Sequence, residues 1–335
     1  HVKAIPGAPD ELLSRAGYLA DRVSINLELP TAQSLSKLAP NKSFKAILEP
    51  MEKITGTIAA NRLALGKDAR MERSSINRYL TGSIFNKNGT DNGQAALSGT
   101  QKTALESGDK LSLPAVSKDM CVKRPFAPAG QSTQMIIGAT PETDLTLIRT
   151  TQHLYKNYDL KRVFYSAYIP LNEDSVLPQL DADVPLLREH RLYQADWLLR
   201  FYGFQADELL SESRPNFNEQ LDPKWDWAIR HLGQFPVEVQ NASYDMLLRI
   251  PGIGPKSARR IVETRRYAKL DFDILKKIGV VLKRAHYFIT CNGRMMYRIP
   301  IEESYITSCL TDDNHKENWE ITHQNEKYQQ LSLFE

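Results

Sequence analysis

The chain has 335 residues with 41% hydrophobic content and a formal net charge of only +3, so it is large enough to bury the cores of two domains. No apolar run approaches the roughly 20 residues of a membrane-spanning helix, so we expect no membrane contact and a cytoplasmic location. The three cysteines, Cys121, Cys291 and Cys309, lie far apart, which argues against a disulfide framework and against a zinc site.

The first half alternates between strand-like and helical patterns. The chain begins at His1 inside a strand-like run, so we expect that an N-terminal part is missing. Further strand-like runs cover 23–29, 135–138 and 162–169, and helical patterns cover 9–21 and 143–155. This alternation predicts an α/β fold, a partial TIM-like β/α barrel over residues 1–180 with too few strands to close. We expect a partner or the missing segment to cover its open strand edges.

The remaining boundaries follow from composition. Residues 86–118 are rich in small and polar residues, which predicts a flexible insert in the barrel. A helical pattern at 187–202 predicts a linker. A helical domain is expected over 181–300, followed by an acidic, disordered tail over 301–335.

Polar residues follow two of the predicted strands. Asn26 and Glu28 lie on one face of their strand, and at the carboxyl end of a barrel strand such residues point toward an active site. An interior hydrogen-bonding layer explains the same pattern. In the other segment a strand ends at Gly138, and Thr140 and Pro141 predict the N-cap and first residue of a helix.

Positive charge is concentrated late in the chain. Residues 250–300 contain twelve lysines and arginines and three acidic residues, a local balance of +9. A basic block in a near-neutral chain is typical of a site for a polyanion. A solvated basic face has the same composition, so the motif inside the block decides between the two.

That motif is a hairpin between two predicted helices. The first helix ends near Ile250, Pro251 to Gly254 predict a tight turn, and Pro255 predicts the first residue of the next helix. The glycines permit positive φ angles and close approach of a ligand, and the exposed amides of the second helix form an anion site. Ile253 anchors the turn in the core. The segment resembles the helix-hairpin-helix motif of DNA repair and recombination proteins.

A weaker copy follows at 275–285, with one glycine where the first has two. Such a pair would grip phosphates across a minor groove without reading bases. A plain helical hairpin that supports the first is the alternative. We predict sequence-independent DNA binding by the following residues: Gly252, Ile253, Gly254, Lys256, Ser257, Arg260, Lys276, Lys277, Gly279 and Lys283.

The tail ends in a short apolar motif, residues 330–334. It resembles the peptide by which partners of bacterial DNA polymerases dock on the sliding clamp. The resemblance implies that Gln330 makes polar contacts, while Leu331, Leu333 and Phe334 supply the apolar ones. We therefore expect the clamp as a partner.

A wider resemblance involves five segments: 1–7, 21–31, 126–134, 138–144 and 165–170. These segments resemble radical S-adenosylmethionine enzymes, in particular a subfamily of DNA modification or repair proteins that end in helix-hairpin-helix motifs. The resemblance implies S-adenosylmethionine and a [4Fe-4S] cluster as cofactors. The cluster-binding CxxxCxxC motif of the family is absent from this chain, and its matching part begins after that motif.

The same resemblance assigns four cofactor residues. Asn26 and Glu28 would contact the ribose or amino group of S-adenosylmethionine, and Gly138 and Glu142 would lie near it in a glycine-containing turn. Two functions follow as expectations. The first is a radical enzyme acting on DNA, active only in a longer form of the protein. The second is a non-catalytic DNA-binding module tethered to the clamp.

Overall fold

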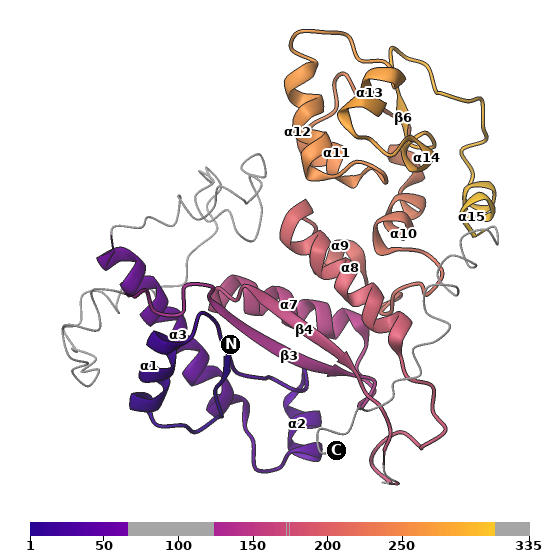
Figure 1. Ribbon diagram of the computed structural model, residues 1–335. Helices are drawn as coiled ribbons and strands as arrows, with labels where there is room; N and C mark the ends of the chain where they lie inside the picture. Colours follow the sequence, from indigo (N-terminus) through magenta and orange to yellow (C-terminus); the bar gives the residue numbers. More distant parts are fainter. Residues whose placement is uncertain (66–123, 172, 174, 312–335) are drawn as a thin grey trace, which may run out of the picture. The chain divides into compact units, whose positions relative to one another are not determined.

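The computed structural model describes residues 1–65, 124–171, 173 and 175–311, which divide after Phe217 into two compact units (Figure 1). The boundary after Phe217 lies well beyond the predicted boundary at residue 180. The predicted insert 86–118 and the clamp-like motif 330–334 lie outside the described residues. In the part of the chain that is described, no helix combines the length and apolar character needed to cross a membrane.

A four-stranded parallel sheet forms the centre of the first unit. Its strands are β1 (Val2–Lys3), β2 (Val23–Ser24), β3 (Gln131–Ile137) and β4 (Arg162–Ala167), and they lie in chain order. The register pairs Val2 with Val23, Val23 with Gln131, and Ser132 with Arg162. The predicted α/β class with a parallel sheet is confirmed, whereas the described residues show no barrel.

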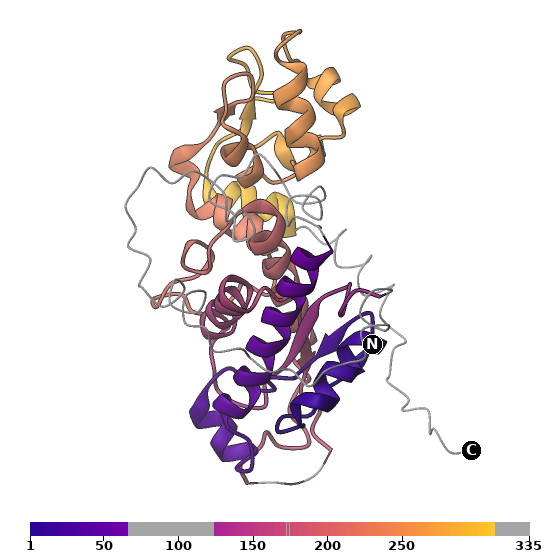
Figure 2. The same cartoon turned by 90° about the vertical axis from the view of Figure 1, so that its left-hand side faces the viewer.

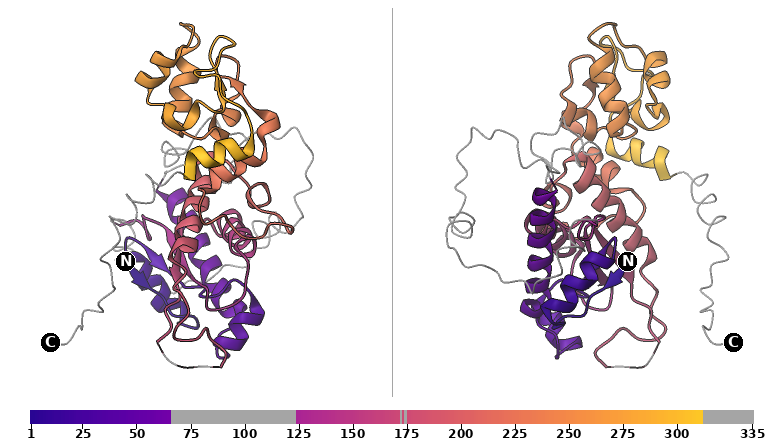
Figure 3. Two further views of the ribbon diagram at one scale, coloured as in Figure 1. Left: turned by 90° about the vertical axis from the view of Figure 1, so that its right-hand side faces the viewer. Right: turned by 60° about the vertical axis from the view of Figure 1, so that its left-hand side comes forward.

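Among the described residues, the first unit has six helices around this sheet (Figures 2 and 3). They are α1 (Asp10–Leu19), α2 (Ala32–Leu38), α3 (Phe44–Ala64), α7 (Asp144–Tyr158), α8 (Leu186–Tyr202) and α9 (Ala206–Leu209). Of these, α3 contacts β3, α8 contacts β4 and α9 contacts α7. Right-handed crossovers between parallel strands in chain order place successive helices on one face. Consistent with this, α1 contacts α3, α3 contacts α7, and α7 contacts α8.

Helix α8 seals the outer edge of β4 instead of forming the predicted linker. Three amides of β4 donate to side-chain oxygens: Val163 to Tyr155 at 3.0 Å, Tyr165 to Tyr193 at 3.0 Å, and Ala167 to Glu189 at 2.6 Å. Tyr193 and Glu189 belong to α8, and Tyr155 to α7. Because these amides are satisfied by side chains, the edge of β4 is closed to a further strand.

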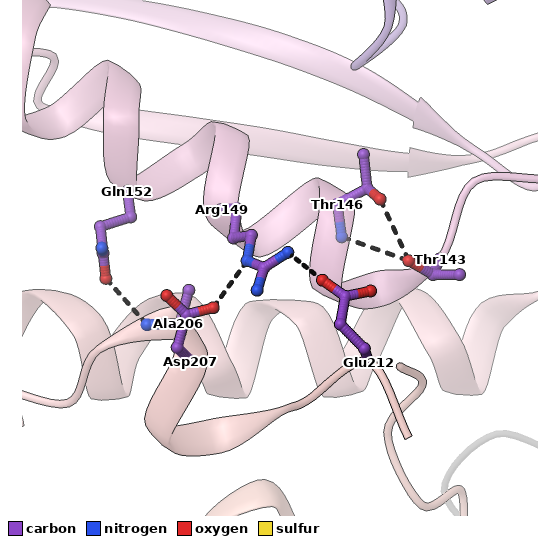
Figure 4. Close-up of polar contacts among 7 residues, drawn as sticks. All are labelled: Thr143, Thr146, Arg149, Gln152, Ala206, Asp207 and Glu212. Carbon is purple, nitrogen blue, oxygen red and sulfur yellow. Dashed lines mark hydrogen bonds and ion pairs between the residues drawn. The ribbon is translucent and has the colours of Figure 1, made fainter. Parts of the chain in front are cut away.

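Helix α7 begins at Asp144, as the helical pattern at 143–155 predicts, but its N-cap is not the predicted Thr140 (Figure 4). Its N-cap is Thr143, whose hydroxyl accepts from the amide of Thr146 at 3.3 Å, so Thr140 and Pro141 precede the helix. Arg149 on the exposed side of α7 bridges Asp207 and Glu212, which fastens the α9 segment to α7.

The second unit is mainly helical. Its elements are α10 (Pro223–Arg230), η2 (Leu232–Gln234), β5 (Val237–Glu238), α11 (Tyr244–Arg249), α12 (Pro255–Thr264), α13 (Phe272–Ile278), α14 (Leu282–Ala285), β6 (Ile289–Thr290) and α15 (Glu303–Thr311). Strands β5 and β6 pair in parallel. Trp225 and Trp227 are buried and belong to the core.

The beginning of the predicted disordered tail is ordered. Residues Glu303–Thr311 form α15, which contacts α10. Ile306 is fully buried, and this apolar contact explains why the segment folds in spite of the acidic residues around it.

Candidate nucleic-acid interface

The first hairpin connects α11 to α12 in the second unit (Figure 1). Gly252 has a φ of +83°, and Ile253 is 1% exposed, as expected for the residue that anchors the turn. A Cβ on Gly252 would lie 2.5 Å from the backbone oxygen of Val281. The positive φ angle and the contact with the second hairpin therefore both require a glycine at this position.

The start of α12 has the features of an anion site. Gly254 is the N-cap, and Pro255 at the first position has no N–H. Among the described residues, the amides of Gly254, Lys256 and Ser257 have no hydrogen-bond acceptor. Unpaired amides at the start of a ten-residue helix attract negative charge through their own dipoles and that of the helix.

The second hairpin packs directly on the first. Its glycine, Gly279, has a φ of +99°, and the amide of Val281 donates to the carbonyl oxygen of Gly252 at 3.0 Å. From α12, the Ser257 hydroxyl donates to the Gly279 carbonyl at 2.8 Å and Arg260 Nη1 donates to the Ile278 carbonyl at 2.9 Å. These two side chains, predicted to contact phosphate, hold the two hairpins together.

The predicted lysines remain available to solvent. Exposed basic side chains flank both hairpins in the sequence: Lys256 follows the first, Lys276 and Lys277 precede the second, and Lys283 and Arg284 follow the second. Exposed cations around unpaired amides supply the attraction for a polyanion that is independent of base sequence.

A buried lysine that the sequence analysis did not identify forms a hydrogen bond with the first hairpin. Lys224, near the start of α10, donates from Nζ to the carbonyl oxygen of Ile253 at 2.7 Å. Burial lowers the pKa of Lys224 from 10.5 to about 7, while Asp222 opposes this shift and Arg249 and Arg284 add to it. Flanked by proline and tryptophan, this lysine has no sequence signal that separates it from a surface lysine.

The contact polarises one of the unpaired amides. The carbonyl of Ile253 and the N–H of Gly254 belong to the same peptide group. A cationic donor on the oxygen withdraws electron density from that group and makes its N–H a stronger donor. Lys224 therefore acts on the anion site without being exposed to it.

The four predicted cofactor residues lie in the first unit, and two of them contact Gln134. Asn26 Nδ2 lies 3.4 Å from Gln134 Oε1, and the amide of Glu28 donates to the Gln134 backbone oxygen at 2.9 Å. The Glu28 carboxylate lies 3.7 Å from the ammonium groups of Lys3 and Lys42. The predicted strand ends early, since β2 stops at Ser24.

The other two are occupied by contacts within the fold. The Glu142 carboxylate accepts from the Thr31 hydroxyl, the N-cap of α2, at 2.8 Å. Burial raises the pKa of Glu142, but hydrogen bonds from Ser34, Thr140 and Thr31 outweigh it, so the pKa lies below its usual value. A Cβ on Gly138 would lie 2.7 Å from Cγ of Pro185. The geometry thus gives both residues a structural role.

The residues that the structure describes do not fit an iron–sulfur cluster. Burial raises the pKa of Cys291 to about 12, which disfavours the thiolate that a cluster requires. In the described ranges, no three His, Cys, Asp or Glu side chains come together as a metal site.

A comparison with protein families finds the helix-hairpin-helix motif at residues 237–264, which span β5, α11, the first hairpin and α12. No curated protein and no solved structure matches the chain. The predicted motif is confirmed, and the match lies entirely within the second unit.

Proposed function

We propose that the second unit binds the sugar–phosphate backbone of DNA without reading the base sequence. The observation that carries this proposal is the set of unpaired amides at the start of α12, directly after the glycine hairpin. The family match to the helix-hairpin-helix motif and the exposed lysines around the site support it.

Titration of the full chain into fluorescent duplexes of unrelated sequence tests the proposal. We expect equal affinities for all of them and a steep loss of affinity with salt, because binding releases counterions from the phosphates. Gly254→Val places a side chain at the amides without violating its φ of −101° and should weaken binding to every duplex alike. A loss confined to one sequence would contradict backbone recognition.

We further propose, as a second candidate function, that the first unit belongs to a radical S-adenosylmethionine enzyme that acts on DNA in a longer form of the protein. The four parallel strands in chain order and the contact between the Asn26 and Gln134 side chains support this proposal. The cluster ligands would have to come from outside the described residues.

Calorimetric titration of the chain with S-adenosylmethionine tests this candidate. Binding that is lost in Asn26→Ala and kept in Asn157→Ala, an exposed change on α7, would support it. Absence of binding would favour the non-catalytic module.

The clamp partner is also a proposal, based on residues 330–334. Deletion of residues 330–335 should abolish binding of the purified clamp and leave affinity for bare DNA unchanged. Unaltered clamp binding would refute it.

A further inference from the structure

The two hairpins of the second unit are copies of one structure. Equivalent residues share backbone conformation or burial: Gly252 and Gly279 have positive φ angles, Ile253 and Val280 are buried, and Ala258 and Ala285 are fully buried. Lys256 and Lys283 also occupy equivalent places and are both exposed. A difference in side chains or in amide hydrogen bonding at equivalent positions therefore changes what each hairpin can bind.

The amides at the start of the following helix differ in this way. In the first hairpin, the amides of Gly254, Lys256 and Ser257 have no acceptor among the described residues. Their equivalents in the second hairpin belong to Val281, Lys283 and Arg284.

Two of these three equivalents are used within the fold. The Val281 amide donates to the Gly252 carbonyl at 3.0 Å, and the Arg284 amide donates to the Val281 carbonyl at 2.9 Å. The helix behind them, α14, has four residues, compared with ten in α12. Because the dipoles of few peptide groups add up there, the second hairpin offers a phosphate little directional attraction.

The tip of the second hairpin also carries a side chain where the first has none. Val281 takes the place of Gly254 and is 51% exposed. An isopropyl group at this position is apolar and keeps an anion away from the backbone. The carbonyls of Ile278 and Gly279, meanwhile, accept hydrogen bonds from α12.

We propose that the hairpins have divided roles: the first grips the phosphates of one strand, and the second supports the first without a directional phosphate contact. The unit thus contacts the phosphates of only one strand of a duplex. It does not contact both strands across a groove. This inference rests on the proposed DNA binding. The lysines of the second hairpin contribute only general electrostatic attraction.

Neutral backbone linkages test the inference on the unaltered protein. Duplexes of about 20 base pairs carry methylphosphonate linkages in one strand, in the other strand or in both. Because recognition does not depend on sequence, we expect either duplex with one neutral strand to bind within about threefold of the unmodified duplex, and the duplex with two neutral strands to lose binding. A loss with one neutral strand as large as the loss with two would overturn the inference.

Substitution of the residue at the tip of each hairpin, followed by measurement of DNA affinity, gives a second test. Gly254→Val gives the first hairpin the side chain that the second hairpin has at this position. Val281→Ala shortens the side chain at the equivalent position of the second hairpin. We expect Gly254→Val to weaken binding about tenfold or more, as for loss of charge-assisted hydrogen bonds, and Val281→Ala to change it less than about twofold. Single strands should bind within about threefold of duplexes in the unaltered protein.

The outcomes separate the two proposals. No binding of either form of DNA contradicts the proposed function itself. Binding with equal losses in the two variants, or a duplex preference of about a hundredfold, contradicts only the division of roles. Tryptophan fluorescence of the buried Trp225 and Trp227 shows whether each variant keeps its fold, and the duplexes with neutral strands, tested with the unaltered protein, decide the question if Gly254→Val does not.

Discussion

The ammonium of Lys224 lies 2.7 Å from the carbonyl oxygen of Ile253, so a buried cation supports the turn whose next amide belongs to the proposed phosphate site. Transfer of a charge from water into the core is unfavourable, and the low pKa of Lys224, about 7, reflects this. Burial of Lys224 thus lowers the stability of the fold and places a positive charge next to the hairpin.

The desolvation penalty on the charged form of Lys224 predicts how the stability of the second unit depends on pH. Below the folded pKa of about 7, Lys224 is charged in both states, and the folded state bears the full desolvation penalty. As pH rises from about 7 to 10.5, the folded state loses the proton first, so the free energy of unfolding should increase by roughly 3–5 kcal/mol. Urea unfolding monitored by tryptophan fluorescence measures this. Lys224→Met should remove the increase, and Lys256→Met, an exposed control, should keep it.

DNA binding should be linked to the same proton. A phosphate at the start of α12 favours the charged form of Lys224 and raises its pKa. The affinity of the unaltered protein should therefore fall as pH rises through about 7, by up to roughly tenfold for each unit by which the pKa is raised. Anisotropy titrations across this range should give a flat profile for Lys224→Met. An unchanged slope in that variant would show that another group carries the proton.

Gly252→Ala should destabilise the second unit strongly. The new Cβ would meet the backbone oxygen of Val281 at 2.5 Å, and the φ of +83° disfavours any side chain. We expect a loss of roughly 2–4 kcal/mol in urea unfolding, since neither hairpin backbone can move alone. Gly233→Ala is the matched control, because a Cβ there meets nothing within 4 Å. Equal stability of the two variants would mean that the hairpins separate readily.

Local patterns predicted the hairpin well because its conformation is encoded in adjacent residues. Glycine and proline fixed the turn, and the apolar Ile253 identified its anchor. The roles of Ser257 and Arg260 were not predictable in this way, since they depend on carbonyls of a second hairpin about twenty residues away.

The start of α7 shows the same limit. Thr140 and Thr143 are both good N-caps by residue type. Thr143 is used because long-range contacts hold the residue after it: the Asp144 amide donates to Asn216, and its carboxylate pairs with Arg188. Burial of Lys224 was likewise beyond local patterns, because only packing of α10 beneath the hairpin creates it.

Tyr193→Phe should weaken the sealed edge of the sheet in the first unit. The Tyr193 hydroxyl accepts from the amide of Tyr165 at 3.0 Å and donates to its carbonyl at 2.8 Å. Loss of the hydroxyl leaves both groups without this partner and should cost about 1–3 kcal/mol. Faster hydrogen exchange of β4 amides would report the change. Tyr158→Phe on α7 is the control, since no hydrogen bond of its hydroxyl occurs among the described residues, and it should leave exchange in β4 unaltered.

The equivalent lysines of the two hairpins provide a final comparison. Lys256→Gln and Lys283→Gln each remove one exposed cation, so each should lower the slope of log affinity against log salt by up to about one. Lys256 lies beside three unpaired amides and Lys283 beside amides that are used within the fold, so a phosphate is held close only to Lys256. At fixed low salt, we therefore expect Lys256→Gln to lose roughly three- to tenfold more affinity than Lys283→Gln. Equal losses, measured by anisotropy with the same duplex, would show that both hairpins hold phosphate in the same way.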